Sequence, residues 1–456
     1  MRLLEVVLVA LLGASGLLLF RRTRTRGLQG WLVVAELLVL LLHAAIEGPH
    51  WQMAPAYLAA LILPLAVPRL LRLRRWLGAT ILLLLLGSIA ASWAVPMFRL
   101  PAPTGPFGIG TRVLEVVNPH PADDSSAGPN SIPDARHIVI QLWYPARKHS
   151  GARAAYRRLK ETELESTYQA VLWTHARWNA PPAAAPMPVL LLNPAWNGRR
   201  TYYTYLAEDL ASHGYMVVGI DHTGNSGPTL FADGHVGKPD PDPKLDFSER
   251  SFAELDAYGG QQVAVWADDN RFVLDALTSW NADPASPFYR QLDLASVGAL
   301  GHSFGGAAAV ETARSDPRVK AAVDYDGSFW GPQVTAALGK PMMMIEEDIG
   351  NPTPEELKDP VTRNDHLLDL RDAVMLDRSH ALYVSLHGST HASFTDRSLY
   401  SPLRSQSWVG SIPAYREYAI LRALTLAFFD QTLRGRPSPL MDGQPHPFPE
   451  VTVTQR

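Results

Sequence analysis

The sequence predicts an α/β domain with a mostly parallel sheet, preceded by an all-α region of about four membrane-spanning helices. Two patterns lead to this prediction: apolar runs fill residues 1–95, and short apolar strands alternate with helices from residue 189 onward. Such alternation is typical of a parallel sheet with helices on both faces. A third observation is the stretch 297–310, in which an apolar strand meets an alanine-rich helix at Gly301-His302-Ser303-Phe304-Gly305.

Composition limits the possible functions. The 456-residue chain is long enough for one large domain and a further region. Its formal net charge of -3 carries no basic excess, so we expect no nucleic-acid partner. The absence of cysteine excludes disulfides and thiolate catalysis. The 15 histidines lack a ligand spacing such as HExxH, so we expect neither a metal nor a cofactor.

The N-terminal region contains four apolar runs of about the length that a bilayer core requires, roughly 17–25 residues, although two reach it only with their flanks. A cleaved signal peptide does not fit the first run, because the basic cluster follows the apolar stretch and no small-residue cleavage site ends it. We therefore expect residues 1–95 to span the membrane about four times, through Leu3–Phe20, Trp31–Ile46, Ala54–Val67 and Leu77–Val95.

The arginines predict the orientation of these spans. They cluster at 21–26 and 69–75, in alternate connections, and positive charge favours the cytoplasmic side. Four spans then place everything after Val95 outside, so we expect a multi-pass protein with an extracytoplasmic (periplasmic or extracellular) catalytic domain. Glu36 and His43 fall within the second span, where they mark a bundle interior or a function.

A proline-rich linker, residues 96–106, leads to the domain expected over residues 107–456. Alternating patterns predict strands early in the domain, and short apolar runs predict buried strands later. The expected strands are Thr111–Val117, His137–Trp143, Val189–Leu192, Tyr215–Ile220, Val297–Leu300, Val319–Val323, Met342–Ile345 and Ala381–Leu386. The expected helices are Tyr202–His213, Gly260–Trp280, Ala307–Arg314 and Tyr415–Leu433.

Ser303 is the candidate nucleophile. A Gly-x-Ser-x-Gly pentad between a strand and a helix is the context of a nucleophile elbow, in which the serine occupies a strained turn. Gly301 and Gly305 let the strand and the helix pass closely, and the first N–H groups of the helix point to where an oxyanion develops. An incidental serine in a glycine-rich turn is the alternative for the pentad alone; the flanking strand and helix favour the nucleophile.

A serine nucleophile needs a histidine base, and His391 is our candidate. It follows the strand Ala381–Leu386, at the sheet edge where Ser303 also emerges. His380 and His387 flank the same strand and compete for the role.

The acid that orients this histidine has two candidates. Asp326 follows the strand Val319–Val323, and Asp348 follows Met342–Ile345. A carboxylate there would hold the imidazole tautomer and stabilise the imidazolium. Spacing alone does not choose between Asp326 and Asp348.

Residues 107–435 resemble the plasma-type platelet-activating-factor acetylhydrolase family of α/β-hydrolases and, more distantly, cutinase-like polyester hydrolases. The N-terminal spans lie outside this resemblance. The resemblance rests on the blocks Gln141-Leu142-Trp143-Tyr144-Pro145, Asp209-Leu210-Ala211-Ser212-His213-Gly214-Tyr215, Gly301-His302-Ser303-Phe304-Gly305-Gly306 and Gly388-Ser389-Thr390-His391 with Phe394.

The resemblance implies an α/β-hydrolase fold and favours Asp326 as the acid, because Tyr325-Asp326-Gly327 is similar to the family's Leu-Asp-x-x motif; Asp348 is the cutinase-like alternative. It also implies an oxyanion hole made by the N–H groups of Phe304 and Trp196. The chain departs from the family just before Trp196, where Pro194-Ala195 replaces the usual His-Gly pair.

These observations predict a membrane-anchored serine hydrolase that cleaves short-chain or lipid-like carboxylic esters through Ser303, His391 and Asp326, without a cofactor. An acyltransferase with the same triad, or a non-catalytic hydrolase-fold membrane sensor or binding protein, is the alternative. The long irregular segment between Asp221 and Phe252, with Leu230, Phe231 and Phe247, is interpreted as a lid or binding loop, or as a solvated insertion.

Overall fold

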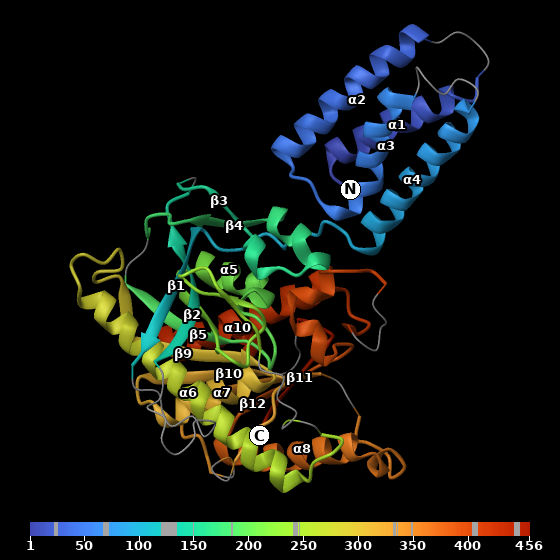
Figure 1. Ribbon diagram of the computed structural model, residues 1–456. Helices are drawn as coiled ribbons and strands as arrows, with labels where there is room; N and C mark the ends of the chain where they lie inside the picture. The colour runs from blue at the N-terminus through green and yellow to red at the C-terminus, as the bar shows by residue number, and fades with distance from the viewer. Residues whose placement is uncertain are drawn as a thin grey trace. The chain divides into compact units, whose positions relative to one another are not determined.

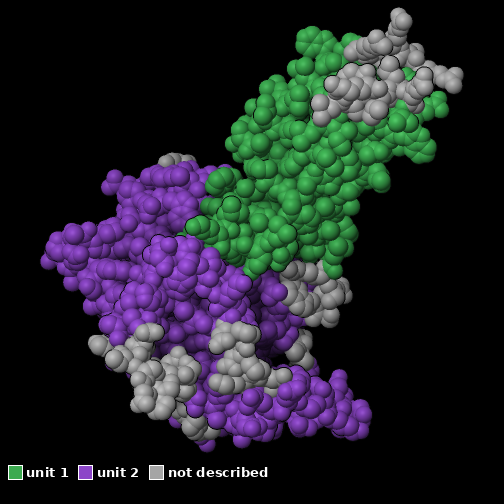
Figure 2. Space-filling view, viewed as in Figure 1, with its two compact units in different colours: residues 1–99, 155–173, 399–404 green, residues 100–154, 174–398, 405–456 purple. Residues whose placement is uncertain are grey.

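A computed structural model describes residues 1–21, 26–66, 73–119, 135–148, 150–183, 186–239, 245, 247–331, 334, 336–347, 350–403, 409–441 and 447–456. The chain forms two compact units (Figure 2). The helical unit comprises residues 1–99, 155–173 and 399–404. The other unit, here called the catalytic unit because it contains the candidate nucleophile Ser303, comprises residues 100–154, 174–398 and 405–456. No sequence pattern pointed to the grouping of residues 155–173 and 399–404 with the N-terminal helices.

The catalytic unit is built on one sheet, whose strand order in the described part of the chain is β13-β12-β11-β10-β9-β5-β6-β2-β1-β4-β3. The neighbouring strands β6, β5, β9, β10, β11 and β12 pair in parallel. Strands β2 and β13 are antiparallel to their neighbours. The expected mostly parallel α/β sheet is therefore confirmed. The strands are β1 Gly108–Asn118, β2 Arg136–Ala146, β3 Arg153–Ala155, β4 Trp173–Trp178, β5 Met187–Asn193, β6 Met216–Asp221, β9 Leu292–His302, β10 Val319–Tyr325, β11 Met342–Glu347, β12 Leu382–Leu386 and β13 Val451–Gln455.

Helices cover both faces of this sheet (Figure 1). On one face α6 (Phe252–Ala282), α7 (Phe304–Ser315) and α8 (Pro360–Ser379) contribute to a single apolar core with the strands. On the other face α5 (Thr204–Ser212) packs on α10 (Ala414–Arg434), with the rings of Tyr205 and Tyr418 stacked 4.1 Å apart. Burial of apolar side chains on both faces is what stabilises a parallel sheet.

Several elements of the catalytic unit were not predicted, among them β3, β4, α8 and β13. Helix α8 has clear start signals, an Asp359 N-cap and Pro360 in the first turn, but it buries only a narrow stripe, so its apolar pattern is weak. Strand β13 is short and half-exposed, and among the described strands it pairs only with β12. Strand β13 extends the sheet beyond β12, so the strand before His391 is not the outermost one.

The helical unit contains α1 (Leu3–Leu18), α2 (Arg26–Ile46), α3 (Ala54–Ala66) and α4 (Arg74–Ala94). By length and composition, two helices of the described residues could cross a membrane, over Gly27–Ile46 and Arg74–Ala94. With 16 and 13 residues, α1 and α3 are shorter than that. The expectation of about four spans is thus supported in part: the described residues of this unit form four α-helices, and two of them have the length of a span.

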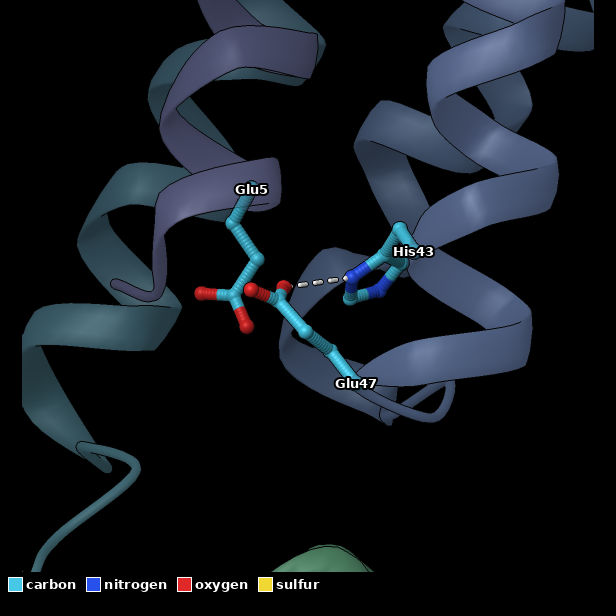
Figure 3. A group of neighbouring side chains, drawn as sticks. All are labelled: Glu5, His43 and Glu47. Carbon is cyan, nitrogen blue, oxygen red and sulfur yellow. Dashed lines mark hydrogen bonds and ion pairs between the residues drawn. The ribbon is translucent and has the colours of Figure 1, made fainter.

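A polar network lies at the end of the bundle where α1 begins and α2 ends (Figure 3). Glu5 and His43 are fully buried. His43 Nδ1 lies 3.0 Å from Glu47 Oε2, and His50 Nε2 lies 3.0 Å from Glu5 Oε1. Arg2 pairs with Glu5 at 2.5 Å, so that a guanidinium already supplies positive charge among these carboxylates.

Both ionisable residues predicted in the second span point into the bundle. Glu36 is buried and accepts a hydrogen bond from Ser15 at 2.5 Å, and His43 belongs to the network just described. A buried ionisable group is costly unless it has a hydrogen-bond partner, and both groups have one inside the bundle. The bundle-interior interpretation of Glu36 and His43 is confirmed.

Candidate active site

Ser303 occupies a strained turn between β9 and α7. Its φ of 57° and ψ of -128° lie outside the regions that non-glycine residues ordinarily adopt. A Cβ at Gly301 would lie 2.0 Å from the Gly305 carbonyl oxygen, and a Cβ at Gly305 would lie 2.3 Å from that of Pro194. Glycine at these two positions is therefore what allows the strand, the turn and the helix to approach so closely.

The turn is also anchored to the next strand. The Ser303 N–H donates to the carbonyl of Tyr325, the last residue of β10, at 2.8 Å. Asp326, which follows directly, has a φ of 55°. The nucleophile candidate and the acid candidate are thus connected through one backbone hydrogen bond.

The structure brings Asp326 and His391 together. His391 begins the 3₁₀ turn η8 (His391–Phe394) after β12, and its Nδ1 lies 2.5 Å from Asp326 Oδ2. Because Nδ1 faces the carboxylate, the proton is held on Nδ1 and Nε2 is the nitrogen that accepts a further proton. The His391 side chain is 50 % exposed, so substrate and water can reach it.

The charges around His391 favour its protonated form. Partial burial lowers the pKa of His391. The hydrogen bond and negative charge of Asp326, together with the charges of Glu347 and Asp365, raise it by a larger amount, so the net shift is upward. An imidazole in this setting is a stronger base than one in water.

The competing histidines have other partners. His387 Nε2 bonds Thr452 Oγ1 at 2.8 Å, and His380 caps the end of α8. His302, next to the serine, is buried and bonds the Tyr203 hydroxyl at 2.9 Å. In the part of the chain that the structure describes, His391 is the one that pairs with Asp326. Asp348, the alternative acid, lies outside the described residues.

In the turn after β5, the backbone N–H groups on either side of Trp196 already have acceptors. Ala195 N–H donates to the Tyr203 hydroxyl at 3.0 Å, Asn197 N–H to the Asn225 carbonyl at 2.8 Å, and Gly198 N–H to the Ala195 carbonyl at 2.7 Å. Among the hydrogen bonds of the described residues, none comes from the N–H of Trp196. The N–H of Phe304, at the first position of α7, has no acceptor within the helix.

Comparison with known proteins bears on what this site does. Residues 131–434, more than half of the chain, match the family model described as platelet-activating factor acetylhydrolase, isoform II. The chain belongs to this family. The resemblance expected from the sequence is confirmed.

Relatives of this acetylhydrolase-family chain are esterases. It is 24% identical over 421 residues to a probable 1-alkyl-2-acetylglycerophosphocholine esterase of Arthroderma benhamiae, covering 82% of this chain and 98% of the relative. It is 22% identical over 246 residues to the platelet-activating factor acetylhydrolase of Bos taurus, covering 49% of this chain and 51% of that protein.

A solved structure is similar as well. The ferulic acid esterase from Streptomyces cinnamoneus matches with a TM-score of 0.61 and 30% identity, covering 78% of this chain and 99% of that one. The family match and these esterase relatives confirm the expected enzyme class, a carboxylic ester hydrolase with an α/β-hydrolase fold.

An aromatic cluster that was not predicted surrounds Phe304 in this acetylhydrolase-family site. The ring of Trp196 stacks on that of Trp266 at 6.0 Å and meets the ring of Phe304 at 4.9 Å. Trp330 closes the cluster, and a Cβ at Gly259 of α6 would lie only 2.2 Å from it. Spacing does not reveal this cluster, because its members come from four separate segments.

The irregular segment before α6 contributes to the same cluster. Phe247 packs on the ring of Trp330 at 5.9 Å. Phe231 lies elsewhere, stacked on His235 beside the small hairpin of β7 (Thr229–Leu230) and β8 (Val236–Gly237). One of the apolar points noted in the sequence, Phe247, therefore reaches the aromatic cluster.

Carboxylates crowd the sheet edge beside the acid–base pair. Glu347, at the end of β11, contacts both Asp326 and His391 and was missed by the sequence analysis. Ligand-type atoms of Asp326, Glu347 and His391 lie within 4.8 Å of one another, the spacing of a group that could hold an ion, but here His391 Nδ1 is already bonded to Asp326. Asp324 is buried, and burial with the charges of Glu346 and Asp326 raises its pKa well above the usual range.

Proposed function

We propose that the chain is a membrane-anchored serine esterase in which Ser303 is the nucleophile, His391 the base and Asp326 the acid. The observation that carries the proposal is the 2.5 Å hydrogen bond between His391 Nδ1 and Asp326 Oδ2, at the sheet edge where the strained Ser303 emerges. Strain at a projecting serine, beside an oriented imidazole, is the arrangement that nucleophilic catalysis requires.

The reaction proceeds through an acyl-enzyme. Ser303 Oγ attacks the ester carbonyl carbon while its proton passes to His391 Nε2. The N–H groups of Phe304 and Trp196 donate hydrogen bonds to the carbonyl oxygen and stabilise the negative charge that develops on it. The intermediate expels the alcohol, which takes the proton from His391, and water then repeats the sequence to release the carboxylic acid.

The preferred substrates are short-chain or lipid-like carboxylic esters. Two observations support this preference: the apolar aromatic cluster around Phe304, and the similarity to an acetylglycerophosphocholine esterase. Trp196, a half-buried member of this cluster, offers apolar ring surface, which favours an acyl chain over the charged phosphate of a diester. Peptide amides and phosphodiesters are expected to be poor substrates.

Membrane anchoring is supported by the outer surface of the bundle. Trp31 and Trp76 are 76 % and 75 % exposed, and each lies near the start of a helix that follows an arginine cluster. Trp93, 61 % exposed, lies 17 residues after Trp76 in α4. At 1.5 Å per residue this separation is about 25 Å, close to the hydrocarbon thickness between two aromatic belts.

The surface between these tryptophans is apolar, as a lipid-facing surface must be. Exposed side chains there include Val34, Leu38, Leu41, Leu83 and Leu86. The shorter α1 and α3 share an apolar core with α4, and in this proposal all four helices lie within the bilayer. The arginine clusters then face the cytoplasm and the polar network of Glu5 and His43 faces the other side.

The segments 155–173 and 399–404, here called the collar, pack on the end of the bundle that carries Glu5 and His43. The Trp51 indole N–H donates to the Glu165 carbonyl at 3.0 Å, and Ser401 Oγ to the Ala94 carbonyl at 2.5 Å. Leu164 of the collar is 84 % exposed. An apolar side chain so exposed, next to the end of a span, is suited to the lipid headgroup region.

A fluorophosphonate probe and an ester panel test the proposal. The probe should label the detergent-purified protein at Ser303, and Ser303→Ala should abolish labelling and lower kcat on the order of 10⁶-fold, by analogy with other triads. Initial rates on p-nitrophenyl acetate, butyrate and palmitate, on short-chain phosphatidylcholine and on a peptide amide define the preference. Retention of more than a few per cent of ester hydrolysis in Ser303→Ala would refute the mechanism.

The same samples separate the alternatives. An acyltransferase would transfer the acyl group to an added alcohol in preference to water, which product analysis detects. A non-catalytic sensor would neither react with the probe nor turn over any ester. Amide cleavage without ester turnover would overturn the substrate preference.

A further inference from the structure

Glu347 stands between the proposed acid and the proposed base. Strand β11 pairs with β10 on one side and with β12 on the other. Asp326 follows β10, His391 lies beyond β12, and Glu347 is the last residue of β11. The three residues therefore share the carboxyl edge of three adjacent strands.

Glu347 bonds both neighbours, with different groups. Its backbone N–H donates to Asp326 Oδ1 at 2.8 Å. Its side-chain Oε2 accepts the backbone N–H of His391 at 2.8 Å. With the 2.5 Å bond from His391 Nδ1 to Asp326 Oδ2, these contacts close a triangle. Asp326 uses one oxygen for Glu347 and the other for His391.

This triangle restrains the two degrees of freedom that matter most for the pair. The amide of Glu347 limits rotation of the Asp326 carboxylate, and the carboxylate of Glu347 fixes the main chain from which the His391 ring extends. Catalytic groups misplaced by about 1 Å lose on the order of 10²-fold in rate. A group that holds both members is placed to prevent such a loss.

The charged groups facing Glu347 come from three elements: Asp326 after β10, His391 in η8 and Asp365 in α8. Burial, and then the charge of Asp326, raise the pKa of Glu347 to about 7, although His391 opposes this rise. Its carboxyl therefore changes its charge in the neutral pH range and adds negative charge near the imidazole above about pH 7, in addition to its role as a hydrogen-bond acceptor.

We propose that Glu347 is a positioning residue for ester hydrolysis, whose backbone amide orients Asp326 and whose carboxylate fixes the main chain of His391. The inference rests on the proposed function of Ser303, His391 and Asp326. It assigns to Glu347 no contact with the substrate.

Two substitutions separate position from charge. Glu347→Gln keeps an oxygen acceptor for the His391 N–H and removes the charge, whereas Glu347→Ala removes both. We expect Glu347→Ala to lower kcat about 10- to 100-fold with KM nearly unchanged. We expect Glu347→Gln to keep kcat within about threefold and to move the acid limb of the pH profile to lower pH, since loss of a nearby negative charge lowers the pKa of His391.

Matched controls accompany these variants. Glu346 precedes Glu347 on β11, but its carboxylate bonds the hydroxyl of Tyr383. Glu346→Gln should leave kcat within about twofold. Should Glu347→Ala fail to fold, Glu347→Asp replaces it, because the shorter side chain keeps the charge but loses the reach to the His391 N–H.

Wild-type kcat in Glu347→Ala would overturn the proposal, and so would an equal loss in Glu347→Gln and Glu347→Ala. Ser303→Ala, assayed in parallel, separates the two levels of inference: turnover by Ser303→Ala refutes the proposed function, whereas an inactive Ser303→Ala beside a fully active Glu347→Ala refutes only the role of Glu347.

The low-field proton resonance of His391 Nδ1 reports the hydrogen bond between His391 and Asp326 without turnover. It should persist in Glu347→Gln and disappear in Glu347→Ala; its survival in both would contradict the proposal.

Discussion

His391 Nδ1 lies 2.5 Å from Asp326 Oδ2, although 65 residues separate them in the chain. The two residues meet because β10, β11 and β12 are adjacent parallel strands, whose carboxyl ends lie at one edge of the sheet. Ser303 joins them at that edge through its backbone bond to Tyr325. The predictions below follow from this arrangement.

Replacing the acid should impair catalysis without unfolding the domain. Asp326→Asn should lower kcat about 10⁴-fold, because an amide at this position favours the wrong imidazole tautomer. Asp348→Asn should have little effect. Asp324→Asn is the matched control: Asp324 is buried, burial raises its pKa well above the usual range, and an amide is nearly isosteric with its carboxyl group. Steady-state kinetics and circular dichroism measure both effects; a larger loss in Asp348→Asn would transfer the acid role to that residue.

Activity should depend on the ionisation of His391. The base must be unprotonated to accept the Ser303 proton, so activity falls as the pH drops through its pKa. Asp326 and Glu347 raise that pKa above its ordinary value of about 6.5, against the effect of burial. The acid limb of the kcat/KM profile should therefore have its midpoint above pH 6.5. A midpoint below that value would show that these carboxylates do not govern the base.

The Tyr203 hydroxyl should support the oxyanion hole indirectly, without contacting the substrate. It accepts the Ala195 N–H and bonds His302, thereby holding the turn that presents the Trp196 amide. Losing an oxyanion donor outright costs about 10²–10³-fold, so loosening the turn in Tyr203→Phe should cost roughly 10-fold in kcat with little change in KM. Tyr144→Phe is the control. The Tyr144 hydroxyl donates to the Ala180 carbonyl, and its loss should leave kcat unchanged. Equal rates in the two variants would exclude this support.

Reporter fusions should locate the catalytic unit outside the cytoplasm. A reporter fused after Arg456 should be active only on the extracytoplasmic side, and one inserted between Arg21 and Arg26 only in the cytoplasm, because the arginine clusters favour that side. Protease digestion of spheroplasts or sealed vesicles provides a second measurement. Accessibility of residues 107–456 from the cytoplasmic side would refute four passes and indicate an odd number.

Several features of this protein could be predicted because their physical cause is local. Only glycine fits at residues 301 and 305, so the elbow is visible as a motif around Ser303. Alternation of apolar strands and helices revealed the mostly parallel sheet, since each element carries its own period. His391 could be proposed as the base because it follows a recognisable strand.

Other features depend on which strands become neighbours, and spacing in the chain does not encode that choice. Asp326 and Asp348 both follow strands, so the sequence left the acid open; the register of β10 beside β11 brings the Glu347 amide to Asp326, and the position of β12 brings His391 to both. Burial likewise decided what composition could not: the apolar stripe of α8 and the edge strand β13 are short, and the packing of segments 155–173 and 399–404 with the helices depends on long-range contacts. Local patterns thus determined the main elements and the serine proposed as nucleophile, whereas tertiary packing decided the pairing of His391 with Asp326, because that pairing is made between residues far apart in sequence.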